Sequence, residues 1–161
     1  VAGEELCKMY YNLWQVQTVI FRYFNVYGPR EPSNGPYAPV VGRFINQYKS
    51  NKPMTVVPDG LQRRDYTHVQ DVVHANILAS KCNSSKILGE IFNIGTGINH
   101  SILELVNIIG GDYIFIESRL GEARETLADI TKAKTLLKWE PKYNIKKYIV
   151  DNLNTDTTIV E

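Results

Sequence analysis

A short, almost continuous apolar run at residues 17–25 restricts the fold of this chain more than any other feature. The run is rich in Val, Ile, Phe and Tyr, which is typical of a strand covered on both faces in a parallel sheet. The turn Tyr27-Gly28-Pro29 ends it, and the proline- and glycine-rich residues 30–39 form a loop. Open α/β sheets bind ligands at loops that leave the carboxyl ends of buried strands, so this loop is a candidate part of a binding site.

Helical and strand patterns alternate along the rest of the chain. A helix is already under way at Val1, with an apolar stripe and no capping residue before it. The pattern predicts further helices at residues 40–48, 70–81, 131–138 and 144–153, and a helix that starts with a capping box at Ser101 to Glu104. It predicts strands at residues 54–57, 66–69 and 91–94, and an edge strand at 113–116. This alternation indicates an α/β fold with a partly parallel sheet and a small mixed lobe.

The composition restricts the classes of partner. A length of 161 residues fits one domain, and 43% hydrophobic with 22% charged residues is ordinary for a globular protein. The formal net charge of +1 provides no global field for nucleic acid or anionic lipid, and no apolar run is long enough to span a membrane. Cys7 and Cys82 lie far apart without metal-ligand spacing, which predicts free thiols in a cytoplasmic protein and no metal site.

Four sequence strings, in their order and spacing, resemble one known family. They are residues 22–30 (RYFNVYGPR), 59–72 (DGLQRRDYTHVQDV), 92–97 (FNIGTG) and 118–122 (SRLGE), the last followed by Ala128-Asp129-Ile130. The chain resembles the extended short-chain dehydrogenase/reductases that act on nucleoside-diphosphate sugars, most closely the UDP-hexose 4-epimerases. The similarity runs over essentially the whole chain.

The resemblance implies that the chain is the C-terminal half of an NAD-dependent epimerase or dehydratase. Residues 1–30 and about 70–97 are then elements of a Rossmann-type parallel sheet. Residues of about 31–69 and 98–161 form the small mixed α/β lobe that binds the substrate. The N-terminal NAD-binding half is expected to be absent, which agrees with a first helix that reads like the start of a cut piece.

The resemblance also implies positions for the sugar and the cofactor. Asn25 matches a family residue beside the bound sugar nucleotide, and an amide supplies both donors and acceptors to hydroxyl groups. Tyr23 and Phe24 match residues near the nicotinamide end of NAD. Arg30 matches arginines that reach the cofactor in some relatives, although a solvated turn arginine explains it equally well. Without the resemblance, Tyr23 and Phe24 are interpreted as strand core.

A clamp for the ligand diphosphate is the third implication. Arg64 and Arg119 match two family arginines, and guanidinium groups bind phosphate oxygens bidentately. Glu122 matches an acidic residue that contacts the ribose, since a carboxylate accepts hydrogen bonds from vicinal hydroxyls. Taken alone, Arg64 beside Asp65 is interpreted instead as a surface ion pair.

The remaining correspondences with the family include the loop that is hardest to align. Thr55 and Val57 match positions that line the base pocket, and residues 37–40 match the loop that packs over the nucleotide. His68 and Asp71 belong to a matched string but receive no catalytic role, and the helix dipole explains an Asp in the first turn of a helix.

The residues that perform the family's chemistry are not found in their expected context. The family uses a Tyr-x-x-x-Lys pair, because a tyrosine with a reference pKa of ~10 needs the lysine and the cofactor's charge to act as a base. That pair would fall immediately before Val1, and Tyr143 with Lys147 is an incidental match. Gly95-Thr96-Gly97 lacks the third glycine and the acidic partner of a dinucleotide loop. We therefore expect no catalytic residue here and most of the NAD site elsewhere.

The first functional hypothesis is part of a UDP-sugar 4-epimerase that acts through a 4-keto intermediate with NAD and is inactive alone. A nucleotide-sugar 4,6-dehydratase or a UDP-glucuronate decarboxylase is the sister alternative within the enzyme class. A non-catalytic module that binds a nucleotide sugar or a partner protein is the alternative outside it. Uncovered strands and apolar patches favour association, and the resemblance implies a homodimer through the N-terminal helix region.

Overall fold

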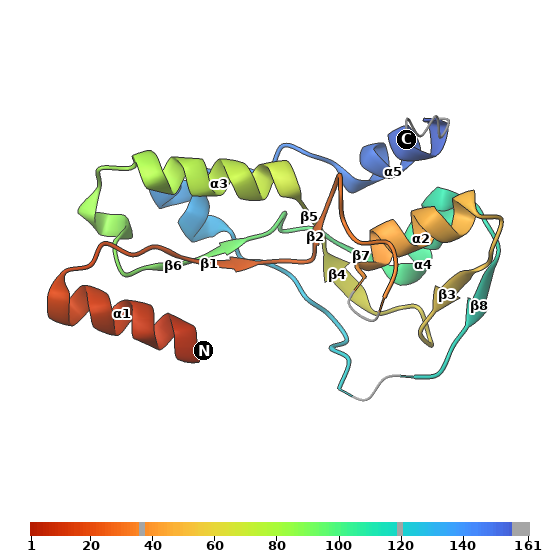
Figure 1. Cartoon of the computed structure of the whole chain (residues 1–161), viewed down its shortest axis with the longest axis horizontal. Helices are drawn as coiled ribbons and strands as arrows, with labels where there is room; N and C mark the ends of the chain where they lie inside the picture. Colours follow the sequence, from red (N-terminus) through yellow and green to blue (C-terminus); the bar gives the residue numbers. More distant parts are fainter. Residues whose placement is uncertain (36–37, 119–120, 156–161) are drawn as a thin grey trace.

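The computed structural model describes residues 1–35, 38–118 and 121–155 (Figure 1). Its α-helices are α1 (Ala2–Trp14), α2 (Val40–Lys49), α3 (Val69–Lys81), α4 (Ile102–Ile109) and α5 (Ile145–Asn154). Its strands are β1 (Ile20–Tyr23), β2 (Val26–Tyr27), β3 (Met54–Val56), β4 (Arg63–Asp65), β5 (Thr67–His68), β6 (Ile91–Ile94), β7 (Asn99–Ser101) and β8 (Tyr113–Phe115). A 3₁₀ turn, η1 (Ser85–Ile87), and a π-helical segment, η2 (Ala133–Leu137), complete the described elements. The mixed α/β fold expected from the sequence is confirmed.

One part of the molecule is built on the parallel pair β1 and β6, in register from Ile20 opposite Ile91 to Tyr23 opposite Ile94. Figure 1 shows α3 along one side of this pair and α1 along the other. Apolar side chains from β6, α3, η2 and their flanking segments form a buried cluster, here called the sheet core. Its buried members are Ala75, Ile87, Phe92, Ile94, Ala128, Ile130, Ala133, Leu137 and Trp139.

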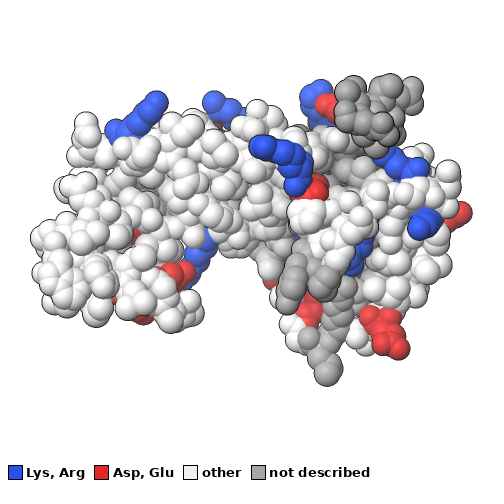
Figure 2. All heavy atoms as spheres, viewed as in Figure 1, with Lys and Arg blue, Asp and Glu red and all other residues white. Residues whose placement is uncertain are grey.

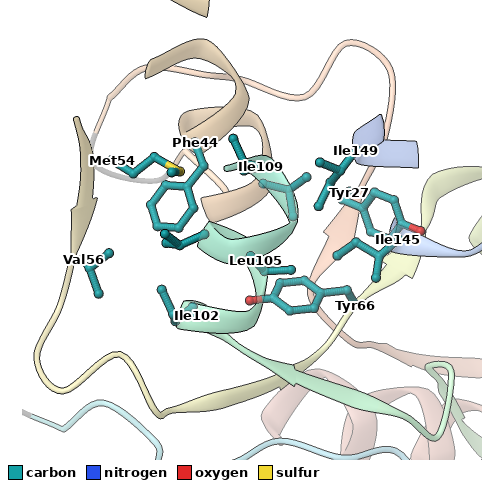
Figure 3. Close-up of a cluster of buried hydrophobic side chains, with 12 residues drawn as sticks. Tyr27, Phe44, Met54, Val56, Tyr66, Ile102, Leu105, Ile109, Ile145 and Ile149 are labelled. Atoms are coloured by element: carbon teal, nitrogen blue, oxygen red, sulfur yellow. The ribbon is translucent and has the colours of Figure 1, made fainter. Parts of the chain in front are cut away.

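The other part packs α2 and α4 against β3, which pairs in parallel with β8, and α5 packs on α2 and α4. Figure 3 shows how side chains from these helices, from β2 and β3, and from Tyr66 point toward one another. This second buried cluster, here called the lobe core, consists of Tyr27, Val41, Phe44, Met54, Val56, Tyr66, Ile102, Leu105, Val106, Ile109, Ile145 and Ile149. The lobe core supports the loop and helix ends that surround the candidate site.

Local sequence explains why α4 lies in this core. Ile102, Leu105, Val106 and Ile109 are buried at helical spacing, so they form one apolar face. The Ser101 side chain accepts a hydrogen bond from the Glu104 N–H, which confirms the predicted helix start, whereas the Glu104 carboxylate binds Arg63 and His100 and does not complete a capping box. The helix ends at Gly110 in the left-handed conformation that glycine adopts without steric cost.

Two short ladders connect the parts: β2 pairs with β5 in parallel, and β4 pairs with β7 in antiparallel orientation. The strand predicted at residues 66–69 is found as the shorter β5, which leads directly into α3. The sequence pattern did not predict β4, which lies before Tyr66 and takes β7 as its partner, while β5 takes β2. The antiparallel β4–β7 pair carries no apolar alternation, so periodicity does not predict it.

The strand at residues 17–25 also differs from expectation. The structure gives β1 at Ile20–Tyr23, and Ile20 is its one buried residue. Arg22 and Tyr23 are exposed and Phe21 is half-buried, so a strand predicted to be covered on both faces is largely open, and β6 is its one partner strand among the described residues. Residues 128–139 pack in the sheet core, whereas the division made from the sequence assigned them to the substrate-binding lobe.

The surface carries no concentrated charge on the face shown in Figure 2, where basic and acidic side chains are scattered. Helix α1 buries no residue, and it is held by Arg22, whose Nε and Nη2 donate to the Glu4 carboxylate at 2.7 and 2.6 Å. Within the described ranges, no helix is both long and apolar enough to cross a lipid bilayer.

Candidate functional site

A cavity of about 300 Å³ opens where β2, the start of α2, β4 and the start of α4 come together. It is lined by Asn25, Val26, Tyr27, Pro39, Val40, Val41, Arg64, Tyr66, Ile102 and Glu122. A smaller cavity of about 120 Å³ shares Val40, Ile102 and Glu122 with the first, so the two adjoin. Its remaining walls come from Ala38, Arg43, Phe44, Thr55, Val57 and Gln62.

These two cavities bring together residues that the sequence comparison singled out from distant segments. Asn25, Arg64 and Glu122 line the larger cavity, and Thr55 and Val57 line the smaller one. Arg119 and Tyr37 lie outside the described residues, so the second arm of the predicted diphosphate clamp has no structural description.

Asn25 is oriented by two hydrogen bonds to neighbouring segments. Its Nδ2 donates to the Asp65 carbonyl at 2.9 Å and to the Thr126 hydroxyl at 3.2 Å. An amide nitrogen has two hydrogens, and the Asp65 carbonyl is purely an acceptor, so these contacts fix which end of the amide is which. The side-chain oxygen is therefore the atom that Asn25 has left to accept a hydrogen bond from a ligand hydroxyl.

Arg64 is held as a cavity residue rather than a surface one. Its side chain is 13% exposed, and its Nη1 donates to the Arg63 carbonyl at 2.8 Å. Its Nη2 donates to the Glu122 carboxylate at 3.2 Å. The reading of Arg64 and Asp65 as a surface ion pair is wrong, because the Asp65 carboxylate points into the protein and binds other groups.

Asp65 is completely buried and organises the turn after β6. Its carboxylate accepts from the Thr96 N–H and hydroxyl at 2.7 Å each, from the Gly97 N–H at 2.9 Å and from the Ala128 N–H at 3.1 Å. A Cβ at Gly95 would lie 2.3 Å from the Ala128 Cβ, so glycine is required there by packing. The amides of this turn are already occupied, which agrees with the expectation that Gly95-Thr96-Gly97 is not a phosphate-binding loop.

The three residues predicted near NAD lie apart from these cavities. The Tyr23 side chain sits beside α3, where its hydroxyl accepts from the Asn76 Nδ2 at 3.0 Å. Phe24 packs against the sheet core, and Arg30 is an exposed residue with a positive φ of 70°. A dinucleotide needs free backbone N–H groups at a helix start. The turn after β6, which most resembles such a cradle in sequence, has its Thr96 and Gly97 N–H groups bound to Asp65 and so does not serve as one.

His68 and Asp71 have structural roles that the sequence did not reveal. The Asp71 carboxylate accepts from the backbone N–H groups of Lys142 and Tyr143 at 2.9 and 3.1 Å, so the explanation by helix dipole alone is wrong. His68 caps α3 by accepting from the Gln70 N–H at 3.2 Å, and burial lowers the pKa of its imidazole. Both side chains tie segments together, consistent with the absence of a catalytic role in the sequence reading.

Tyr143 and Lys147 do not form a catalytic pair. The Tyr143 ring stacks on His68 with a centroid separation of 4.2 Å, whereas the Lys147 Nζ lies 3.3 Å from the Asp151 carboxylate. The two side chains are thus engaged by different partners, as expected for an incidental match.

Three further cavity residues escaped the sequence reading. Tyr66 is buried, its hydroxyl has no hydrogen-bond partner among the described residues, and burial raises its pKa. Gln62 donates from Nε2 to the Val57 carbonyl at 3.2 Å, and its Oε1 is also buried without a described partner. Arg43 donates to the Gly35 carbonyl at 3.0 Å and thereby holds the loop before α2. Tyr66 and Gln62 stand in the same string as Arg64, which was the available signal.

The fold and the cavity define a class of protein, a Rossmann-type α/β protein with a cavity beside its lobe core. Residues 1–95 match the NAD dependent epimerase/dehydratase family. The chain belongs to that family, which is NAD-dependent.

Relatives of known sequence and structure agree with this assignment. A putative UDP-glucose 4-epimerase of Methanocaldococcus jannaschii is 37% identical over 91% of this chain and 48% of that protein. A UDP-N-acetyl-alpha-D-glucosaminuronate decarboxylase of Bacillus cytotoxicus is 42% identical over 66% of this chain and 32% of that protein. The crystal structure of UDP-glucuronic acid 4-epimerase from Bacillus cereus, in complex with UDP-glucuronic acid and NAD, superposes with a TM-score of 0.83 and 35% identity, covering 94% of this chain and 49% of that one. The chain thus spans about half the length of these 4-epimerase relatives.

Proposed function

We propose that this chain forms the nucleotide-sugar-binding part of an NAD-dependent enzyme that epimerises a UDP-sugar at C4. The observation that carries the proposal is the convergence of Asn25, Arg64, Glu122, Thr55 and Val57 on two adjoining cavities. Similar proteins named as UDP-glucose 4-epimerases, and a similar 4-epimerase solved with UDP-glucuronic acid and NAD, support the choice of ligand.

Each part of the ligand has a matching group in the cavities. We assign the diphosphate to Arg64, with Arg119 as the second arm, and the ribose to Glu122. The base occupies the smaller cavity between Thr55 and Val57, and a sugar hydroxyl donates to the free oxygen of Asn25. Guanidinium groups suit phosphate, and carboxylate or amide oxygens suit hydroxyl groups.

The proposed reaction passes through a 4-keto sugar and needs a base and NAD. This chain supplies neither a Tyr-x-x-x-Lys pair in the family's context nor a glycine-rich dinucleotide loop. We therefore propose that the chain binds the nucleotide sugar and performs no turnover by itself. A 4,6-dehydratase or UDP-glucuronate decarboxylase remains the sister proposal, which the similar decarboxylase favours, and a non-catalytic binding module is the proposal of the other class.

Titration calorimetry with UDP tests the binding proposal. Arg64→Ala should weaken UDP binding about tenfold to hundredfold, because a charged hydrogen bond to phosphate is lost. Lys147→Ala is the control, since Lys147 pairs with Asp151 at 3.3 Å on the surface and lines neither cavity. Equal UDP affinity for the wild type and Arg64→Ala would remove the diphosphate assignment.

A homodimer through α1 is the proposed assembly. Helix α1 buries no residue and exposes Leu6, Met9, Tyr10, Leu13 and Trp14. An apolar stripe of this kind favours association with a second copy. Light scattering at micromolar concentration should give a dimer that Leu13→Glu dissociates, and a monomer for the wild type would contradict the proposal.

A cytoplasmic location is also proposed. Both Cys7 and Cys82 are free thiols, which supports it.

A further inference from the structure

The Arg64 guanidinium is already neutralised inside the larger cavity. The partner is Glu122, whose carboxylate lies 3.2 Å from the Arg64 Nη2. Both side chains are mostly enclosed, with 13% and 28% of their surface exposed. An anion that approaches Arg64 therefore meets an occupied guanidinium rather than a free one.

Glu122 is held in this position by the segment that follows it. The Arg63 N–H donates to the Arg124 carbonyl at 2.9 Å, and the Thr126 N–H donates to the Arg63 carbonyl at 3.0 Å. These bonds align residues 124–126 with β4, the strand that carries Arg64. The Arg124 side chain adds a 2.8 Å bond to Asp59. The contact between Arg64 and Glu122 thus joins two segments that the backbone already keeps in register.

Glu122 also borders the smaller cavity, which Arg64 does not. A carboxylate in that place can accept hydrogen bonds from a ligand that fills both cavities. A bare anion fills one cavity and would displace Glu122 from Arg64 without giving the carboxylate any new partner. Leaving the mostly enclosed Glu122 carboxylate without a partner costs free energy. Displacement of Glu122 from Arg64 is therefore favourable for a ligand that fills both cavities and unfavourable for a bare anion.

We propose that Glu122 is an internal counter-ion that makes Arg64 selective for nucleoside diphosphates over inorganic anions. The diphosphate of the nucleotide replaces Glu122 on the Arg64 Nη2, and the released carboxylate then accepts from the ribose hydroxyls at the boundary of the smaller cavity. Phosphate or pyrophosphate has no ribose hydroxyl to donate to the released carboxylate and is disfavoured. This inference rests on the proposed binding of a nucleoside diphosphate and adds a selection step to it.

Calorimetric titration with inorganic pyrophosphate and with UDP, at one ionic strength, tests the selection. Glu122→Gln should bind pyrophosphate about five- to tenfold more tightly than the wild type, because the competing charge is gone. Its affinity for UDP should stay level or fall, because the carboxylate that accepts from the ribose is lost as well. Glu122→Asp retains the charge and should keep the preference of the wild type for UDP.

Glu125→Gln is the matched control on the same segment, since Glu125 accepts from the Asn99 Nδ2 and lines neither cavity. It should leave both affinities unchanged. Normal UDP binding by the wild type together with an unaltered ratio of pyrophosphate to UDP affinity in Glu122→Gln would overturn the role of Glu122. An equal gain for both ligands would also overturn it, because Glu122 would then only compete. Absence of UDP binding to the wild type would instead overturn the proposed function on which the inference rests.

Discussion

The lobe core and the sheet core differ in how completely the described residues enclose them. The lobe core is enclosed by the buried apolar faces of α2, α4 and α5, and both cavities open beside it. In the sheet core, β1 pairs along one edge only, and Tyr23 remains 47% exposed. The comparison teaches that the residues proposed to bind the ligand are positioned by the more fully enclosed part, whereas the residues expected near the cofactor lie on the open part.

Buried carboxylates nevertheless join the two cores. Asp65 stands on β4 beside the larger cavity, and its partners Thr96, Gly97 and Ala128 belong to segments next to the sheet core. Asp71 links the start of α3 to Lys142 and Tyr143, just before α5. Networks of this kind are strong when every acceptor is satisfied and costly when one is lost. The two cores are therefore expected to unfold together.

Asp65→Asn should produce the largest loss of stability. The amide would place an NH₂ group among backbone donors, which removes charged hydrogen bonds and leaves donors unpaired, so the free energy of unfolding should fall by about 3 kcal/mol. The chain has two tryptophans, Trp14 and Trp139, so a Trp14→Phe background makes the fluorescence report on Trp139 alone. Urea denaturation in that background, followed by fluorescence and by far-UV circular dichroism, gives this value for the sheet core and for the whole chain.

The surface substitution Asp112→Asn serves as the control for Asp65→Asn and should change stability by less than about 0.5 kcal/mol. Coincident transitions for the two probes would support a single cooperative unit. Separate transitions in the wild type would contradict it and would mean that the two cores unfold independently.

A matched pair of substitutions separates the roles of the cores. Phe44 and Phe92 are both buried, with 1% and 0% of their surface exposed, but Phe44 lines the smaller cavity while Phe92 lies in the sheet core. Phe44→Leu and Phe92→Leu should each cost about 1 to 2 kcal/mol of unfolding free energy. Phe44→Leu should also weaken UDP binding about threefold, which is less than 1 kcal/mol, and Phe92→Leu should leave that affinity intact. Equal effects of both on UDP binding, measured by calorimetry on folded protein, would remove the functional distinction.

The sequence was informative where a periodic pattern coincided with burial. Helices α2, α3 and α5 and strand β6 lie within one or two residues of their predicted ranges, because apolar spacing reports directly on the buried face. Strands β4 and β7 were missed, since their pairing is fixed by contacts between distant segments and not by alternation along either strand.

The candidate site was predictable only as far as the resemblance reached. Matching strings located Asn25, Arg64 and Glu122, but nothing in the chain's own pattern indicated that Glu122 would pair with Arg64. The partners of Asp65 were equally hidden, because four groups from two later segments converge on one carboxylate through tertiary structure. Pairings of this kind depend on which loops meet, a property that local propensity does not determine.

Glu31 places a buried carboxyl without a described hydrogen-bond partner in the otherwise well-enclosed lobe. Its substitution should have the smallest effect on the free energy of unfolding. Its side chain packs where a Cβ on Gly42 would lie, at 2.7 Å, and burial raises the pKa of its carboxyl to about 7. The backbone N–H groups of Gly28 and Gly42 lower that pKa in part, yet neither carboxylate oxygen has a described partner of normal hydrogen-bond geometry. Glu31 begins the loop that leads to the cavity wall at Pro39 and Val40.

The sign of the pH dependence follows from the raised pKa. The ordinary pKa of a glutamate carboxyl is 4.5. Between about pH 4.5 and pH 7, Glu31 is therefore protonated in the folded chain and ionised in the unfolded chain. Stability from this group is fully present below that range and is lost as the pH rises through 7. Because Glu31 is only partly buried, solvent screens its charge, and we expect a loss of about 1 kcal/mol, well below the value that the whole pKa shift would give.

Glu31→Gln should remove this dependence, because an amide does not titrate. Urea denaturation at several pH values between 5 and 8 should show the wild-type free energy of unfolding falling by about 1 kcal/mol more than that of Glu31→Gln. Glu140→Gln, at an exposed position, should follow the wild type. A parallel pH course for wild type and Glu31→Gln would mean that the carboxylate is ionised throughout this range, and that the lobe accommodates its charge as readily as water does.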